Sequence, residues 1–145
     1  MFADFLTRLL APAPETLPDA DARLALSALM VRLARSDGDY AASERARITD
    51  ILAARYGLGQ AEAEALRAEA EALEAEAPDT VRFTRAIKDA VPLEAREAVL
   101  EALWQVALAD GTREAHEDSL MRMVTNLLGF TDQESARARQ RATRA

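Results

Sequence analysis

Apolar residues recur along this chain at intervals of three and four positions, the spacing that places them on one face of an α-helix. Proline, glycine and Asp-Gly steps separate the apolar runs, as they do at helix ends. The pattern predicts helices over about 2–10, 19–36, 43–56, 60–77, 81–91, 92–110 and 120–128, and from 131 onward. The sequence therefore predicts an all-α fold, a single-domain helical bundle of seven to eight helices.

The width of each apolar face predicts where its helix lies in the bundle. The segments that begin at Leu24 and Leu93 have wide apolar faces, so we expect both helices to be central. The segment 60–77 has a narrow stripe of Ala and Leu and is expected to pack along one edge. Its glutamates are expected on a solvated outer face, the alternative being an interaction surface for a basic partner: Glu62, Glu64, Glu69, Glu71, Glu74 and Glu76. The expected core includes Val81, Phe83, Met30, Trp104, Met121 and Met123.

Several helix ends carry recognisable capping residues. Ser43 is the expected N-cap residue of the helix that follows it, with Glu44 in the first turn. Gly57 and Gly129 each follow an apolar run and are expected to end a helix in a left-handed conformation. Thr131 and Glu134 have the spacing of a capping box.

Composition narrows the possible chemistry. The 145 residues contain no cysteine, which excludes disulfides, thiolate metal sites and cysteine nucleophiles. The net charge of −7 argues against nucleic-acid binding, which needs clustered Lys and Arg. The arginines at the end of the chain are expected to complement a helix dipole, Arg137, Arg139, Arg141 and Arg144.

The N-terminal segment and the hydropathy of the chain predict its surroundings. The residues Met1 to Glu15 lack the basic and sustained apolar regions of a signal peptide, and no apolar stretch is long enough to span a membrane. We expect a soluble cytoplasmic protein. Residues 1–16 are expected to form an amphipathic helix and a Pro-containing linker, and this helix is expected to dock on the bundle rather than on a membrane. Residues 17–136 are expected to form the helical domain, and residues 137–145 a basic helix end or tail.

One sequence motif occurs twice in the chain. Asp37-Gly38 and Glu44 match Asp110-Gly111 and Glu117 at an offset of 73. Further along, Gly57-Leu58 and Glu62 match Gly129-Phe130 and Glu134 at an offset of 72. Each half reads as apolar helix, Asp-Gly loop, helix, glycine stop and acidic helix start, so the sequence predicts an internal duplication.

The two copies resemble the TerB family of tellurite-resistance proteins. The resemblance is carried by "ARSDGDYAASERARITDIL", "VPLEAREAVLEALWQVA" and "ALADGTREAHEDSLMRMVTNLLGF", and it covers about residues 24–134. It implies a TerB-like helical bundle of two related halves and a link to stress and tellurite response. A relative of the family stands at the start of membrane-bound J-domain co-chaperones. The resemblance also implies divalent-cation binding at an acidic surface.

Two interpretations of the Asp-Gly loops are open. In the structural one, glycine ends a helix while the carboxylates cap the turn and the next helix. In the functional one, the loops bind Ca²⁺ or Mg²⁺ through carboxylate oxygens, although the EF-hand pattern is missing. The candidate metal ligands are Asp37, Asp39 and Glu44 in the first loop and Asp110, Glu114 and Glu117 in the second.

No enzymatic arrangement is recognisable. The chain has one histidine, His116, and no phosphate-binding glycine loop or nucleophile–base set. We expect a non-enzymatic binding module with an unidentified protein partner. The alternative is a scaffold or self-association domain that forms a homodimer, with the N-terminal helix or the segment 60–77 as its contact and the Asp-Gly loops purely structural.

Overall fold

The computed structural model describes residues 19–36, 40–76, 80–108 and 115–144. Within these ranges the chain forms seven α-helices and no strand, which confirms the predicted all-α bundle. The helices are α2 (Asp19–Arg35), α3 (Ala42–Tyr56), α4 (Gln60–Glu76), α5 (Thr80–Ala90), α6 (Leu93–Ala107), α7 (Ala115–Leu127) and α8 (Asp132–Arg144). The predicted N-terminal helix lies outside the described residues.

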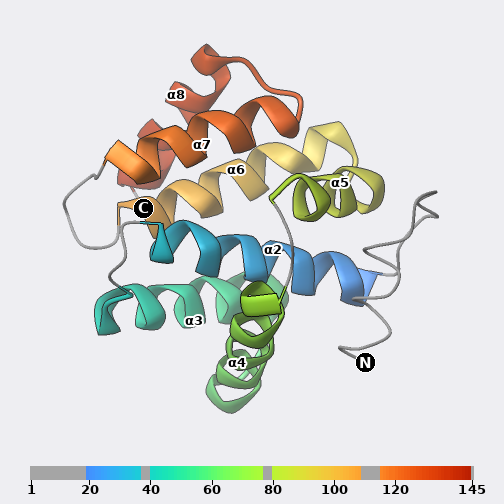
Figure 1. Ribbon diagram of the computed structural model, residues 1–145, viewed down its shortest axis with the longest axis vertical. Helices are drawn as coiled ribbons and strands as arrows, with labels where there is room; N and C mark the ends of the chain where they lie inside the picture. Colours follow the sequence, from blue (N-terminus) through green and yellow to red (C-terminus); the bar gives the residue numbers. More distant parts are fainter. Residues whose placement is uncertain (1–18, 37–39, 77–79, 109–114, 145) are drawn as a thin grey trace.

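Helix α2 lies at the centre of the molecule, as its wide apolar face predicts. It contacts α3, α4, α5, α6 and α7, and Figure 1 shows it crossing the middle of the bundle. Every residue from Leu24 to Ala34 is buried except Arg32, which is partly buried. A helix that is apolar on nearly all sides is stable only when other helices surround it.

Helix α6 is the second central helix. It contacts α2, α3, α7 and α8, and Val99, Leu100 and Leu103 are fully buried on it. The chain thus has two three-helix halves, α2–α3–α4 and α6–α7–α8, joined by α5. In each half the first helix packs along the third.

The middle helices α3 and α7 end with the same backbone device. Gly57 and Gly129 have φ angles of 65° and 90°. The next amide donates across the turn in both cases, Leu58 N–H to the Ala53 carbonyl and Phe130 N–H to the Thr125 carbonyl, each at 3.0 Å. These 6→1 bonds satisfy carbonyls that the helix end would leave unpaired.

The third helix of each half also begins in the same way. The Glu62 carboxylate accepts a hydrogen bond from the Gly59 N–H at 3.3 Å, and the Glu134 carboxylate accepts one from the Thr131 N–H at 2.8 Å. The Thr131 hydroxyl oxygen accepts from the Glu134 N–H at 3.2 Å, which completes the predicted capping box. These bonds to Thr131 lower the pKa of the Glu134 carboxyl.

The prediction for the start of α3 was wrong by two residues. The N-cap residue is Ala41, and Ser43 lies at the second position of the helix. Glu44, at the third position, accepts a hydrogen bond from the Ala41 N–H at 3.1 Å. Because this carboxylate supplies the capping acceptor, the helix begins before the serine.

Two expected core residues are exposed. Val81 on α5 is 48% exposed and Met123 on α7 is 42% exposed. Each lies two positions from a buried residue, Phe83 and Met121 respectively. Two positions correspond to about 200° around a helix, so these side chains point away from the bundle. Met30, Phe83, Trp104 and Met121 are buried as expected.

Helix α8 runs through the boundary at residues 136/137 that the sequence suggested. Ala138 and Ala142 are buried, and Arg141 lies 3.7 Å from Glu97 and 3.3 Å from Glu101 on α6. Arg139 lies over the Trp104 ring. The described arginines 139 and 141 therefore make tertiary contacts in addition to any dipole effect. No helix of the described ranges is long and apolar enough to cross a membrane.

The two positive-φ glycines predict a matched stability test. Gly57→Ala and Gly129→Ala each place a Cβ atom in the left-handed region and should lower the free energy of unfolding by about 1–2 kcal/mol. Gly59→Ala is the control, since Gly59 has no positive φ and its added Cβ would meet only the Glu62 side chain at 3.6 Å. Urea unfolding measures all three, and an equal loss in the control would contradict the shared helix end.

Candidate functional site

The first Asp-Gly loop joins α2 to α3 and is anchored at both ends. On the α2 side, the Ser36 hydroxyl donates a hydrogen bond to the Leu33 carbonyl at 2.7 Å. On the α3 side, the Ala41 amide donates to Glu44. The residues between them, Asp37 and Asp39 included, lie outside the described residues, so the site is characterised by what holds its two ends.

Tyr40 ties the second end of this loop to α4. Its hydroxyl donates to Glu71 Oε2 at 2.7 Å, and Arg67 Nε lies 3.6 Å from the same oxygen. The guanidinium groups of Arg35 and Arg45 lie 5.5 and 5.4 Å from the centre of its ring. Burial, followed by the hydrogen bond and the negative charge of Glu71, raises the pKa of Tyr40 above its ordinary value.

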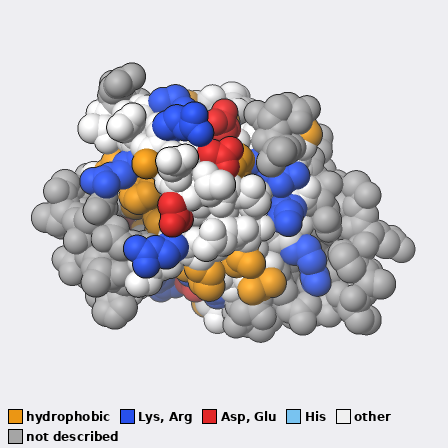
Figure 2. Space-filling view, turned by 90° about the horizontal axis from the view of Figure 1, so that it is seen from above, with side chains coloured by type: hydrophobic (Ala, Val, Ile, Leu, Met, Phe, Trp, Pro, Cys, Tyr) orange, Lys and Arg blue, Asp and Glu red, His pale blue; other side chains and the backbone are white. Residues whose placement is uncertain are grey.

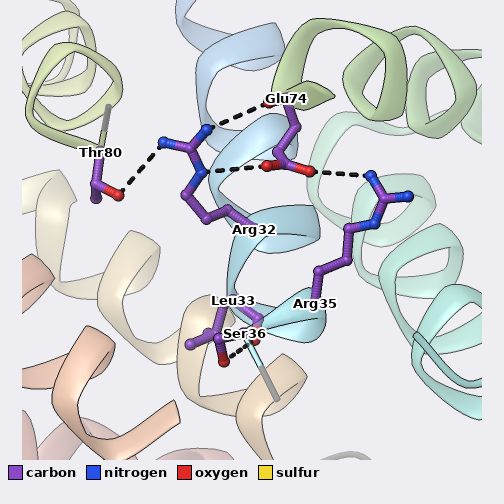
Figure 3. Close-up of polar contacts among 6 residues, drawn as sticks. All are labelled: Arg32, Leu33, Arg35, Ser36, Glu74 and Thr80. Carbon is purple, nitrogen blue, oxygen red and sulfur yellow. Dashed lines mark hydrogen bonds and ion pairs between the residues drawn. The ribbon is translucent and has the colours of Figure 1, made fainter. Parts of the chain in front are cut away.

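The end of α2 is held by a carboxylate shared between two arginines. Arg32 Nε lies 3.3 Å from Glu74 Oε2, and Arg35 Nη1 lies 3.0 Å from Glu74 Oε1. Figure 3 shows the two guanidinium groups on opposite sides of this side chain. Arg32 also donates to the Glu74 carbonyl at 3.2 Å. We call Arg32, Arg35 and Glu74 the arginine clamp.

The clamp reaches α5 as well as α4. Arg32 Nη1 donates to the Thr80 hydroxyl at 3.5 Å, and its guanidinium lies 5.0 Å from the centre of the Phe83 ring. A partly buried guanidinium needs such partners because burying an unpaired charge is costly. Arg32 therefore connects the central helix to two of its neighbours.

The expectation that all six glutamates of α4 face solvent was wrong for two of them. Glu71 and Glu74 are only partly exposed and bond to residues of α2 and the following loop. Each lies one position after a buried residue, Ala70 or Leu73, and so borders the packed face. Glu62, Glu64, Glu69 and Glu76 are exposed as expected.

The candidate metal ligands fall into three groups. Glu44 is in the first turn of α3, as expected, but it is 2% exposed and one oxygen accepts the Ala41 amide. Glu117 lies at the third position of α7, where Glu44 lies in α3. Asp37, Asp39, Asp110 and Glu114 are outside the described residues. Among the described side chains, no three Asp, Glu or His groups come together as a metal site would require.

We call the connections from α2 to α3 and from α6 to α7, which contain the Asp-Gly steps, the two corners. Both begin at the same end of the bundle. In Figure 1, α2 and α6 run in the same direction, and both finish on the side where α3 and α7 start. The duplication thus places the two Asp-Gly loops at equivalent positions in the chain path.

The anchoring residues around the first corner were not predicted. The one available signal was Arg32, the single charge in the run from Leu24 to Ala34, which implies a partner elsewhere. The second half lacks the clamp, because an offset of 73 places Gln105 at the position of Arg32 and Leu108 at that of Arg35. The two halves share a backbone but not these ion pairs.

These features define a duplicated all-α bundle with paired helix–loop–helix corners. The model of a protein family described as tellurite resistance protein TerB matches residues 23–140. The chain therefore belongs to the TerB family, as its repeated motifs indicated. Neither the comparison with curated proteins nor the comparison with solved structures gave a match.

The raised pKa of Tyr40 predicts a loss of stability in alkali. In the unfolded chain Tyr40 loses its proton near pH 10, whereas the folded protein keeps it protonated. Its contribution to stability is thus complete below pH 10 and is lost as the pH rises further. The Tyr40→Phe variant cannot titrate there.

Urea unfolding at pH 9 and 11 measures this effect. The wild-type free energy of unfolding should fall more steeply between the two pH values than that of Tyr40→Phe. The chain has a single lysine, Lys88, so few other side chains titrate in this window. An identical fall in both proteins would show that Tyr40 is not held by Glu71.

Proposed function

We propose that this TerB-family chain is a non-enzymatic binding module that holds a divalent cation, Ca²⁺ or Mg²⁺, at its Asp-Gly corners and acts in a stress or tellurite response. The observation that carries the proposal is the anchoring of the first corner at both ends. Ser36 closes α2, and Tyr40 and Ala41 are tied to Glu71 and Glu44. Only three residues lie between these anchors.

So short a connection restricts where the carboxylates of Asp37 and Asp39 can lie. Each residue extends the chain by at most about 3.6 Å, so both carboxylates stay close to the fixed ends. Oxygen atoms of this kind are what Ca²⁺ and Mg²⁺ bind. An anchored loop loses less conformational freedom when an ion binds than a free loop would.

Glu44 has a supporting role in this proposal. One of its oxygens accepts the Ala41 amide, and the side chain is buried. It therefore fixes the end of the loop, while Asp37 and Asp39 supply the ion ligands. Asp110, Glu114 and Glu117 are the counterpart set in the second half, where Gln105 and Leu108 replace the arginines of the clamp. Weak affinity is expected because few ligands are fixed.

An NMR titration with calcium and with magnesium tests the cation proposal. Amides of residues 36–44 should shift and saturate at millimolar ion, and the double change Asp37→Asn and Asp39→Asn should abolish the shifts. Asp50→Asn is the matched control, because Asp50 is exposed on α3 outside the corner. Flat spectra, or shifts that survive the double change, would leave the loops a structural device.

Self-association is the second candidate function, and the exposed apolar side chains favour it. Val81 and Met123 are the large exposed apolar residues of the described part, and their helices α5 and α7 contact each other. A shallow groove of about 410 Å³ next to Met123 is lined by Ser119, Arg122, Asn126 and Leu127. A second copy of the chain would cover this surface, as in a scaffold or co-chaperone-like domain.

Light scattering with and without calcium separates the two functions. A concentration-dependent dimer that ignores calcium and is lost in the double change Val81→Ser and Met123→Ser supports self-association. A monomer at all concentrations contradicts it. A change in size that requires calcium favours the cation-binding module.

A further inference from the structure

The second half contains a pocket that neither corner explains. It has a volume of about 220 Å³ and lies where α6, α7 and α8 meet. Its buried lining residues include Trp104, Met121, Thr125 and Ser135, while Arg122 and Arg139 line it from the exposed side. The pocket therefore joins an apolar and hydroxyl-bearing interior to two solvent-facing cations.

The interior of the pocket carries a buried polar network. The Trp104 indole N–H donates to Ser135 Oγ at 3.0 Å, and the Thr125 and Ser135 hydroxyl oxygens lie 3.1 Å apart in a hydrogen bond. All three side chains are buried. Burying such groups costs free energy unless they are hydrogen-bonded, and these three side chains bond to one another.

The first half shows that the fold does not need this network. An offset of 73 aligns Trp104 with Val31, and the offset of 72 set by the matched helix ends aligns Thr125 with Ala53 and Ser135 with Ala63. All three counterparts are apolar, and Val31 and Ala63 are 0% exposed, while Ala53 is partly buried. The same helix junction thus has apolar residues at these positions in the first half and a polar network beside a pocket in the second.

The arginines differ between the halves in the same sense. Arg67, the counterpart of Arg139, donates to the Thr49 hydroxyl at 2.7 Å and lies near Glu71, so it is engaged within the bundle. Arg139 instead lies 5.5 Å from the centre of the Trp104 ring. Among the described residues, neither Arg122 nor Arg139 forms an ion pair with a carboxylate.

The surroundings of the pocket favour an anion. Figure 2 looks down on the α7–α8 end and shows basic side chains spread across this face, with acidic side chains between some of them, although the whole chain has a net charge of −7. Guanidinium groups match the planar geometry of a carboxylate. Asp132 also lines the pocket and would repel a ligand with several negative charges, which favours one carboxylate over a phosphate.

We propose that this pocket binds a small organic carboxylate. The carboxylate lies between Arg122 and Arg139, and the apolar part of the ligand packs against Trp104 and Met121. The volume is below the roughly 300–1,000 Å³ of pockets for drug-sized ligands, so the ligand is compact. This binding goes beyond the cation proposal and is independent of it.

The single tryptophan of the chain makes the proposal directly testable. Benzoate is the probe, added in the presence of a chelator so that no divalent cation contributes. Its titration should shift the Trp104 indole N–H resonance and saturate. Benzamide, which has nearly the same shape without the charge, should bind at least about tenfold more weakly, because it lacks the charge-assisted hydrogen bonds.

Substitutions at the pocket identify the anion contacts. Arg122→Gln and Arg139→Gln should each weaken benzoate binding by about tenfold, since each removes a charge-assisted contact. Arg137→Gln is the matched control, because Arg137 is exposed on the same helix and is not among the residues lining the pocket. Both pocket arginines are exposed, so these variants should fold, which circular dichroism checks.

Three results would overturn the proposal. One is the absence of a saturable indole shift with benzoate. Another is equal binding of benzamide, which would show that the charge is not recognised. The third is an equal effect of Arg137→Gln, which would reduce the interaction to general attraction by a basic face.

Discussion

The burial of α2 is the constraint on which the rest of the structure depends. Five helices contact it, and ten of the eleven residues from Leu24 to Ala34 are buried. Burial of apolar surface on this scale is the main favourable term in folding. The exception, Arg32, requires partners on α4 and α5, so this charge constrains where those two helices lie against α2. The first corner follows directly from the end of α2, so the position of α2 determines where this corner begins.

The two halves share their backbone devices and differ in how their side chains are used. Gly57 and Gly129 end the middle helices alike, and Glu62 and Glu134 begin the third helices alike. Around this common frame, the first half has the arginine clamp, and the second half has the polar pocket beside Trp104. Duplication followed by divergence therefore separates two surfaces: an anchored acidic corner in one half and a cationic pocket in the other.

Features that depend on neighbouring residues could be predicted from the sequence, and features that depend on tertiary pairing could not. The helices, the glycine stops and the Thr131–Glu134 capping box all arise within a few positions of the chain. The prediction of Ser43 as the N-cap was wrong because the Glu44 side chain, inside the helix, accepts the hydrogen bond from the N-cap amide. Glu71 and Glu74 had the appearance of a solvated face, since nothing local reveals that Tyr40 and two arginines of α2 lie opposite them. Periodicity alone does not predict whether a residue at the margin of an apolar stripe is buried or exposed.

Hydrogen exchange in the native state tests the central role of α2 most directly. The amides of α2 should exchange most slowly of all, because exposing α2 requires the helices around it to separate. Their opening free energy should equal that of global unfolding measured in urea. The outer helix α8 should exchange through smaller openings. If the α2 amides exchange faster than those of α8, or if the two halves open independently of each other, α2 is not the element on which the bundle is built.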